Sequence, residues 1–332
     1  MNQVVCIGEL LVDFFTVDTD VSLSEAHLYV KKAGGAPANV CATIARLGGE
    51  ARFCGKVGRD GFGRFLEETL IRYGVDTRYL MKSDLSTTLA FVTRQQGGER
   101  DFVFQRGADG DVTSADLAAF SFEEQVAHFG SATALLSEPF RGAYIDLMGK
   151  LRERGTFISF DPNFRDALWA GREADYLEAV KICISLADFV KMSEEEYALL
   201  QHALKQEGKS IEALSSAIFA ITLGEKGTKL MIGKEERIIQ SIVVDSVDTT
   251  GAGDAFVGGM LYQLANEQLS PVREQIINRR ADNKQVETVL LNALVEMVKF
   301  ANIVGAFTCT KVGAMDAIPT LEDVIHYIRV DS

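Results

Sequence analysis

The sequence is poor in cysteine, proline and positive charge. Its five cysteines are scattered, and none belongs to a C-x-x-C pair, so we expect reduced, buried thiols. Five prolines in 332 residues, with 47% hydrophobic residues, give no sign of disorder or of collagen-like repeats. The net charge of −13 repels nucleic acids and anionic membranes, so we expect neither as a partner.

Several familiar sequence signals are also missing. No uncharged apolar run approaches about 20 residues, and no basic segment precedes a small-residue cleavage site near residue 1. We therefore expect a soluble, cytoplasmic protein. Neither G-x-x-x-x-G-K-[ST] nor G-x-G-x-x-G occurs, which argues against a P-loop enzyme and against a nucleotide-dependent dehydrogenase.

Short β-branched apolar runs alternate with longer helical patterns along the chain. Strand-like runs occupy residues 4–7, 157–160, 189–192 and 218–222. Apolar residues recur at helical spacing in residues 146–152, 176–186 and 211–217. This alternation predicts an α/β fold with a mostly parallel, doubly wound sheet covered by helices.

Two stretches, residues 14–32 and 87–106, interrupt this alternation. Both are strand-like, and the second contains a turn signal at residues 96–99. We predict that they form antiparallel strands of a small β lid. The main α/β domain would then consist of residues 1–13, 33–86 and 107–332.

The most informative segment is residues 248–259, which read D-T-T-G-A-G-D-A-F-V-G-G. It follows a strand-like run at residues 242–244 and opens a predicted helix. Small residues at a helix N-terminus leave backbone N–H groups free to surround an anion such as phosphate. Asp254, in the first turn, could accept the proton of an attacking hydroxyl. The alternative is a glycine-rich turn in which Asp254 only stabilises the helix end.

A second glycine cluster, residues 34–39, reads G-G-A-P-A-N and also precedes a predicted helix. Pro37 suits the first helical turn, and the glycines let the backbone approach a small ligand. Asn39 offers both donors and acceptors, as the hydroxyls of a polyol do. An ordinary helix start would explain the glycines and the proline equally well.

Both clusters belong to longer patterns. Residues 34–63 contain G-G-A-P-A-N, A-R-L-G-G and G-K-V-G-R-D-G-F-G, and they resemble the N-terminal signature of the PfkB or ribokinase family. Residues 248–256 resemble its C-terminal signature, and the similarity extends over essentially the whole chain. The resemblance implies a ribokinase-like three-layer α/β/α sandwich with a mostly parallel central sheet and a small β-sheet lid.

The resemblance also implies roles for individual residues. Asp254 matches the catalytic base of the family. Gly251, Ala252 and Gly253 match the anion hole for the transferring phosphoryl group. The positions that bind sugar hydroxyls are matched by Asp13, Gly34, Gly35 and Asn39.

ATP and Mg²⁺ are the cofactors that the resemblance implies. Glu196 matches a position associated with Mg²⁺, reached through water, but Ser193 stands where the family has asparagine. This run also fits an ordinary helix N-cap. Asp248 and Thr250 match ligands of a monovalent cation such as K⁺. The nucleotide-binding positions are matched by Lys191, Ser193, Glu196, Thr222, Gly224, Gly227 and Asn302.

Residues 102–109 and 159–169 resemble fructokinases, which implies that Arg106 and Arg165 bind the sugar. Kinases of 2-keto-3-deoxygluconate share much of this pattern, and arginines paired with acidic neighbours on a surface loop are a further alternative. We expect transfer of the γ-phosphoryl group of ATP to a primary hydroxyl, that of fructose at position 6 first of all. Another sugar or nucleoside kinase of the family is the alternative. The family also suggests a homodimer formed through the lid.

Overall fold

The computed structural model describes residues 3–94, 102–280 and 288–330. Within these residues, a nine-stranded sheet has the order β13-β12-β11-β10-β9-β8-β1-β4-β5. Its strands are parallel except at one edge, where β12 and β13 run antiparallel to their neighbours. The strands of this sheet are β1 (Val4–Ile7), β4 (Ala51–Gly58), β5 (Asp76–Ser83), β8 (Val126–Phe129), β9 (Phe157–Phe160), β10 (Phe189–Ser193), β11 (Ile218–Thr222), β12 (Thr228–Ile232) and β13 (Glu235–Ile239).

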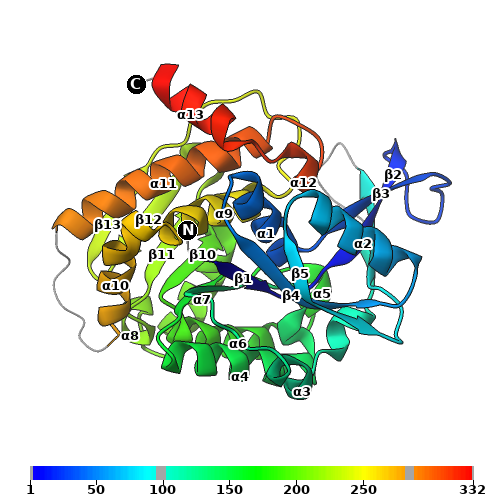
Figure 1. Ribbon diagram of the computed structural model, residues 1–332, viewed down its shortest axis with the longest axis horizontal. Helices are drawn as coiled ribbons and strands as arrows, with labels where there is room; N and C mark the ends of the chain where they lie inside the picture. Colours follow the sequence, from blue (N-terminus) through cyan, green and yellow to red (C-terminus); the bar gives the residue numbers. More distant parts are fainter. Residues whose placement is uncertain (1–2, 95–101, 281–287, 331–332) are drawn as a thin grey trace.

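Helices cover both faces of the sheet, which confirms the three-layer α/β/α sandwich. Figure 1 shows α1, α9 and α11 on one side and α4 and α6 on the other. The helices are α1 (Ala36–Arg46), α2 (Gly61–Arg72), α3 (Ser114–Ala118), α4 (Phe140–Glu153), α5 (Asp166–Trp169), α6 (Glu173–Leu186), α7 (Glu194–Gln206), α8 (Ile211–Leu214), α9 (Ala252–Leu264), α10 (Ser270–Asn278), α11 (Thr288–Thr308), α12 (Ala314–Ala317) and α13 (Leu321–Val330).

The alternation of side chains along each strand divides the core into two layers. In β1, Val4 and Cys6 pack with α1, α9 and α11, whereas Val5 and Ile7 pack with α4 and α6. Helix α11 is long and apolar enough to span a membrane by length and composition, but most of its apolar stretch is buried and it packs along α9. It is therefore accounted for as a core helix.

Most of the predicted elements occur where the sequence places them. The strands at residues 4–7, 157–160 and 218–222 are confirmed to the residue. The predicted helix at residues 211–217 is shorter, because α8 ends at Leu214. The predicted strand at residues 242–244 was wrong: these residues form no strand, and Val243 is 97% exposed. Ile242 is partly buried against the cluster that contains Leu47 and Val304, but none of the described strands pairs with this segment.

A second, four-stranded sheet has the order β3-β2-β6-β7. The expectation of purely antiparallel strands was wrong at its centre, where β2 and β6 run parallel. The turn predicted at residues 96–99 lies outside the described residues. The proposed division into lid and main domain stays a prediction. The strands are β2 (Leu11–Thr19), β3 (Tyr29–Gly34), β6 (Leu89–Arg94) and β7 (Phe102–Gln105).

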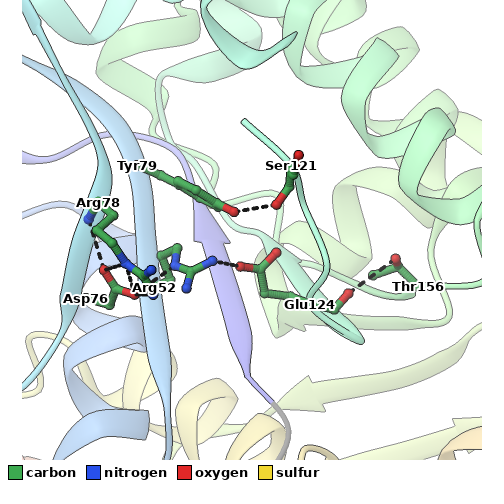
Figure 2. A network of polar contacts seen from close by, with 7 residues as sticks. All are labelled: Arg52, Asp76, Arg78, Tyr79, Ser121, Glu124 and Thr156. Carbon is green, nitrogen blue, oxygen red and sulfur yellow. Dashed lines mark hydrogen bonds and ion pairs between the residues drawn. The ribbon is translucent and has the colours of Figure 1, made fainter. Parts of the chain in front are cut away.

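A buried polar network lies at the end of the large sheet where its parallel strands begin. The guanidinium of Arg52 donates to Asp76, with a distance of 2.9 Å from Nε to Oδ2, and also to Glu124 (Figure 2). The same guanidinium lies over the ring of Tyr79, 4.5 Å from its centroid. Glu124 is separated from the start of β8 by Gln125 alone, so this network holds the first end of that strand.

Candidate active site

A cavity of about 340 Å³ lies where β1, β8 and β9 end. The strand order reverses at β1, whose neighbours are β4 on one side and β8 on the other, and such a switch point is where open α/β sheets bind ligands. The start of α1, the start of α9 and one face of the small sheet complete the wall. The residues of β2 that line the cavity are Leu11, Asp13 and Phe15, which alternate as a strand requires.

Helix α9 begins at the cavity because Gly251 adopts a left-handed backbone conformation, with φ of 80°. A Cβ atom at this position would lie 2.6 Å from Cβ of Ala314. Thr250, Gly251 and Asp254 all line the cavity. The first turn of α9 therefore brings the expected anion hole and the expected base to one place, where the positive end of the helix dipole favours an anion.

Asp254 is 8% exposed and accepts a hydrogen bond from Asn39, with 2.8 Å between Nδ2 and Oδ2. Burial raises the pKa of Asp254 to about 6, against the opposing effects of the Asn39 hydrogen bond and the charge of Lys191. A carboxyl group with this pKa is mostly ionised at neutral pH and is still basic enough to take up a proton. The structure thus joins the two glycine-rich segments through Asn39 and Asp254.

Lys191 forms a buried ion pair beside α9. Its Nζ lies 3.0 Å from Oδ2 of Asp161, and a Cβ atom on Gly253 would come within 2.8 Å of it. Burial alone would lower the pKa of Lys191, but the charges of Asp161, Glu196 and Asp254 outweigh it and raise the pKa. The ammonium group therefore stays charged next to the start of α9.

Asp13 on β2 and Gly34 on β3 are diagonal neighbours, because Gly34 pairs with Leu11 and Asp13 pairs with Lys32. A Cβ atom on Gly34 would collide with Oδ2 of Asp13, so the glycine makes room for that carboxylate. Gly35, with φ of 111°, lies so close to the carbonyl of Glu9 that it also has no space for a side chain. Burial raises the pKa of Asp13 to about 7, although the charge of Arg165 opposes the shift.

Replacing Gly34 with alanine should therefore displace the carboxylate of Asp13 from the cavity. Because the resemblance assigns Asp13 to sugar binding, we expect KM for the sugar to rise by about tenfold, the equivalent of one hydrogen bond to a charged group. KM for ATP should stay within about twofold. Steady-state kinetics with each substrate varied in turn checks this. Gly149→Ala, at an α4 position where a Cβ atom would meet nothing within 4 Å, is the matched control, and an unchanged sugar KM in Gly34→Ala would contradict the assignment.

The two arginines predicted to bind sugar are placed differently. Arg165 lines the cavity, with Nη1 donating to the carbonyl of Phe164 at 2.8 Å. Arg106 does not contribute to that lining. Its guanidinium donates to Ser137 at 2.7 Å and to the carbonyl of Thr133 at 2.8 Å, and it also pairs with Asp109.

Most of the expected nucleotide-binding positions lie at or just after the ends of β10 and β11. Ser193 caps α7 and forms a capping box with Glu196, as the N-cap alternative predicted. Both carboxylate oxygens of Glu196 accept backbone N–H groups, from Ser193 at 2.7 Å and from Phe164 at 2.6 Å. Each oxygen keeps a lone pair, so the geometry fits contact with Mg²⁺ through water.

Thr222 ends β11, and Gly224 and Gly227 in the following loop have φ of 61° and 94°. The Asn302 amide links α11 to the large sheet: Oδ1 accepts from Thr228 at 2.7 Å, and Nδ2 donates to the carbonyl of Ile239 at 3.1 Å. These bonds hold the loop around Gly227 beside α11. A nucleotide-binding role for Asn302 stays a prediction.

Asp248 and Thr250 form a compact turn ahead of α9. Oδ1 of Asp248 accepts from Oγ1 of Thr250 at 2.6 Å, and Oδ2 accepts from the backbone N–H of Gly313 at 2.9 Å. Across residues 3–94, 102–280 and 288–330, His, Cys, Asp and Glu side chains form no group of three or more able to hold a metal ion. A monovalent cation here stays a prediction.

Sequence reasoning did not identify several residues that shape the cavity. Glu9 and Asp161 follow β1 and β9, and Thr133 follows β8, so each lies at the carboxyl end of a parallel strand. Burial, with the charge of Asp109 as a smaller cause, raises the pKa of Glu9 to about 7 despite its hydrogen bonds to Ser131 and Ala36. Asp161 directly follows β9, and a polar residue in that position was the signal that could have revealed it. Glu9 and Thr133 lie further beyond the ends of β1 and β8 and offered no such signal.

Comparison with known proteins identifies the family of this chain. Residues 1–321 match the model of the pfkB family of carbohydrate kinases, and the chain belongs to that family. Fructokinase-1 of Oryza sativa is 39% identical, over 98% of this chain and 97% of the relative.

Two solved structures are similar over nearly the whole chain. Fructokinase of Xylella fastidiosa with bound ATP matches with a TM-score of 0.83 and 29% identity, covering 99% of this chain and 98% of that one. Fructokinase of Vibrio cholerae with fructose, ADP and calcium matches with a TM-score of 0.79 and 30% identity, covering 98% and 99%.

Proposed function

We propose that this kinase transfers the γ-phosphoryl group of ATP to the 6-hydroxyl of fructose. The observation that carries the proposal is the position of Asp254, buried at the start of α9 and open to a cavity with polar groups on several sides. Fructokinases among the relatives and solved structures support fructose over 2-keto-3-deoxygluconate.

In the proposed reaction, Asp13, Asn39 and Arg165 orient the sugar so that its hydroxyl reaches Asp254. Asn39 engages Oδ2 of Asp254, so we assign proton uptake to Oδ1. The phosphoryl group lies against the first turn of α9, where Gly251, Ala252 and Gly253 provide the anion hole. When bound, Mg²⁺ neutralises charge on the phosphates, and Glu196 is the residue that would hold it through water.

A substrate panel tests the sugar assignment. We expect fructose to have the highest kcat/KM among fructose, 2-keto-3-deoxygluconate, ribose and adenosine, because the similar relatives and solved structures include fructokinases. ATP-dependent ADP release with each compound measures this. If 2-keto-3-deoxygluconate were better by about tenfold, which equals about 1.4 kcal/mol of transition-state stabilisation, the fructose assignment would be wrong.

We also propose that the small sheet acts as a lid and that two copies of the chain pair through it. Residues 14–32 and 87–106 would close over the sugar, and two copies would pair through the lid. Its exposed apolar side chains Val17, Leu28 and Val30 support such pairing. Light scattering of the chain and of Leu28→Asp tests it, since a monomer in both would contradict the dimer.

A cytoplasmic location is likewise proposed. The five cysteines are free, and all but Cys309 are buried. Free thiols of this kind fit a reducing compartment. Fractionation of cells that express the chain would test the location, and recovery in a membrane or secreted fraction would contradict it.

A further inference from the structure

Ser131, which follows β8, is the centre of a buried hydrogen-bonded cluster. Its hydroxyl donates to Oε2 of Glu9 and accepts the backbone N–H groups of Thr133 at 3.2 Å and Ala134 at 2.8 Å. The other oxygen of Glu9 accepts the backbone N–H of Ala36, the first residue of α1, at 3.0 Å. One carboxylate therefore joins the turn after β8 to the start of α1.

The packing around Glu9 leaves little freedom. Gly8 has φ of 152°, and a Cβ atom there would lie 2.6 Å from Cγ of Pro37 and 2.9 Å from Cβ of Ser131. Glu9 is 1% exposed and Ser131 is 3% exposed. Residues 8–9 are thus wedged between the two segments that the carboxylate joins.

A second buried carboxylate, Asp109, binds the same turn from the side of the small sheet. Its Oδ2 accepts from Oγ1 of Thr133 at 2.7 Å and pairs with Arg106, while Oδ1 accepts from Thr88. Thr88 directly precedes β6, and Arg106 directly follows β7. Asp109 is therefore bonded to residues at the ends of two strands of the small sheet.

Together these bonds form one chain that runs from the small sheet to the catalytic base. Asp109 accepts a hydrogen bond from the Thr133 hydroxyl, and the Ser131 hydroxyl accepts the N–H of Thr133. Glu9 in turn accepts the hydroxyl proton of Ser131. Glu9 fixes the start of α1, and Asn39 in the first turns of α1 binds Asp254. Of these residues, Glu9, Thr133, Asn39 and Asp254 line the cavity, as do Leu11, Asp13 and Phe15 of β2.

We propose that Glu9 and Asp109 are positioning residues for the sugar: acting through Ser131 and Thr133, they set the cavity wall and the start of α1 relative to the small sheet. Arg106 then acts through Asp109 and the carbonyl of Thr133. This inference rests on the proposed sugar kinase activity. It adds two residues that act on the sugar through their bonded neighbours, Glu9 from the cavity lining and Asp109 from outside it.

Glu9→Gln tests the first carboxylate. Oε1 faces the N–H of Ala36 and Oε2 faces the hydroxyl proton of Ser131, so the amide N–H₂ would oppose a donor in either orientation. We expect KM for the sugar to rise by about tenfold or more, with KM for ATP within about twofold. Asp109→Asn, which removes the charge paired with Arg106, should change the same parameter in the same direction.

The matched control is Glu124→Gln at the opposite end of β8 (Figure 2). Glu124 is also buried and also bonded, to Arg52, so its replacement should lower Tm as the test variants do. It should leave both KM values unchanged. A merely structural role for Glu9 and Asp109 would lower Tm in all three variants without raising the sugar KM.

A double variant, Glu9→Gln with Asp109→Asn, tests whether the two act as one chain. We expect the rise in sugar KM to be smaller than the product of the two single effects, because either change already releases the turn at residues 131–134. A rise equal to that product, or single variants that fold with a normal sugar KM, would overturn the proposal. If Glu9→Gln does not fold, Ser131→Ala removes the central hydroxyl and takes its place, with the same expected rise.

The assays use the sugar that the unaltered chain phosphorylates fastest in the panel, and sugar binding is also measured by calorimetry without ATP. Failure of the unaltered chain to phosphorylate any sugar would refute the proposed function. Normal sugar affinity in the folded variants would refute only the positioning roles.

Discussion

Replacing Asp254 with asparagine should lower kcat by about two to four decades, the range expected for loss of a general base. The variant keeps the size of the side chain, and its amide can rotate so that the oxygen still accepts the hydrogen bond from Asn39. Sugar affinity should therefore stay close to normal. Rapid-mixing or steady-state kinetics with ATP and fructose, together with calorimetric sugar binding, measure both quantities. Asp146→Asn, on an exposed turn of α4, is the matched control and should be fully active.

The pH dependence of the unaltered enzyme provides an independent check. Burial raises the pKa of Asp254 to about 6, and the base acts only when deprotonated. The value of kcat/KM should therefore fall as the pH drops below about 6, and the limb assigned to Asp254 should be missing from the residual activity of Asp254→Asn. A variant with near-normal kcat would remove Asp254 from the reaction.

The second large effect is expected from Lys191→Met. The change leaves Asp161 buried without its ion-pair partner, which should lower the free energy of unfolding by about 3–5 kcal/mol. It also removes a positive charge that lowers the pKa of Asp254. The acid limb of the pH profile should therefore move to higher pH. Chemical denaturation and pH-dependent kinetics measure the two effects separately.

Two variants sharpen the Lys191 prediction. Lys299→Met, on α11 with its side chain 55% exposed, should change the unfolding free energy by less than about 1 kcal/mol. Lys191→Met with Asp161→Leu removes both charges and should recover much of the lost stability. Because the charge of Asp161 raises the pKa of Asp254, the double variant should also move the acid limb back toward its normal pH. An unchanged profile in Lys191→Met would show that its charge does not act on Asp254.

Local sequence patterns predicted the parts of the fold that depend on neighbours in the chain. The strand at residues 157–160 is a short buried run. The helices that begin at Ala36 and Ala252 each follow a glycine with a positive φ, a conformation that other residues rarely adopt. The contact between Asn39 and Asp254 joins residues 215 positions apart. Only the family resemblance placed them in one site, because nothing local specifies that α1 packs against α9.

Other features needed the tertiary structure. The parallel pairing of β2 with β6 depends on how the chain returns to the small sheet after β5, which strand composition does not encode. Arg106 was expected to bind the sugar because of its neighbours in sequence, and that role stays a prediction. The bonds of its guanidinium to Ser137, Thr133 and Asp109 depend on the tertiary structure and could not be read from the sequence.

The most direct test is to incubate the purified chain with fructose and ATP and to identify the products by ³¹P and ¹³C NMR. The account predicts stoichiometric conversion to ADP and fructose 6-phosphate, with the phosphate coupled to carbon 6 and almost no product formed by Asp254→Asn. Transfer to another carbon, release of inorganic phosphate in place of a sugar phosphate, or equal turnover by Asp254→Asn would contradict it.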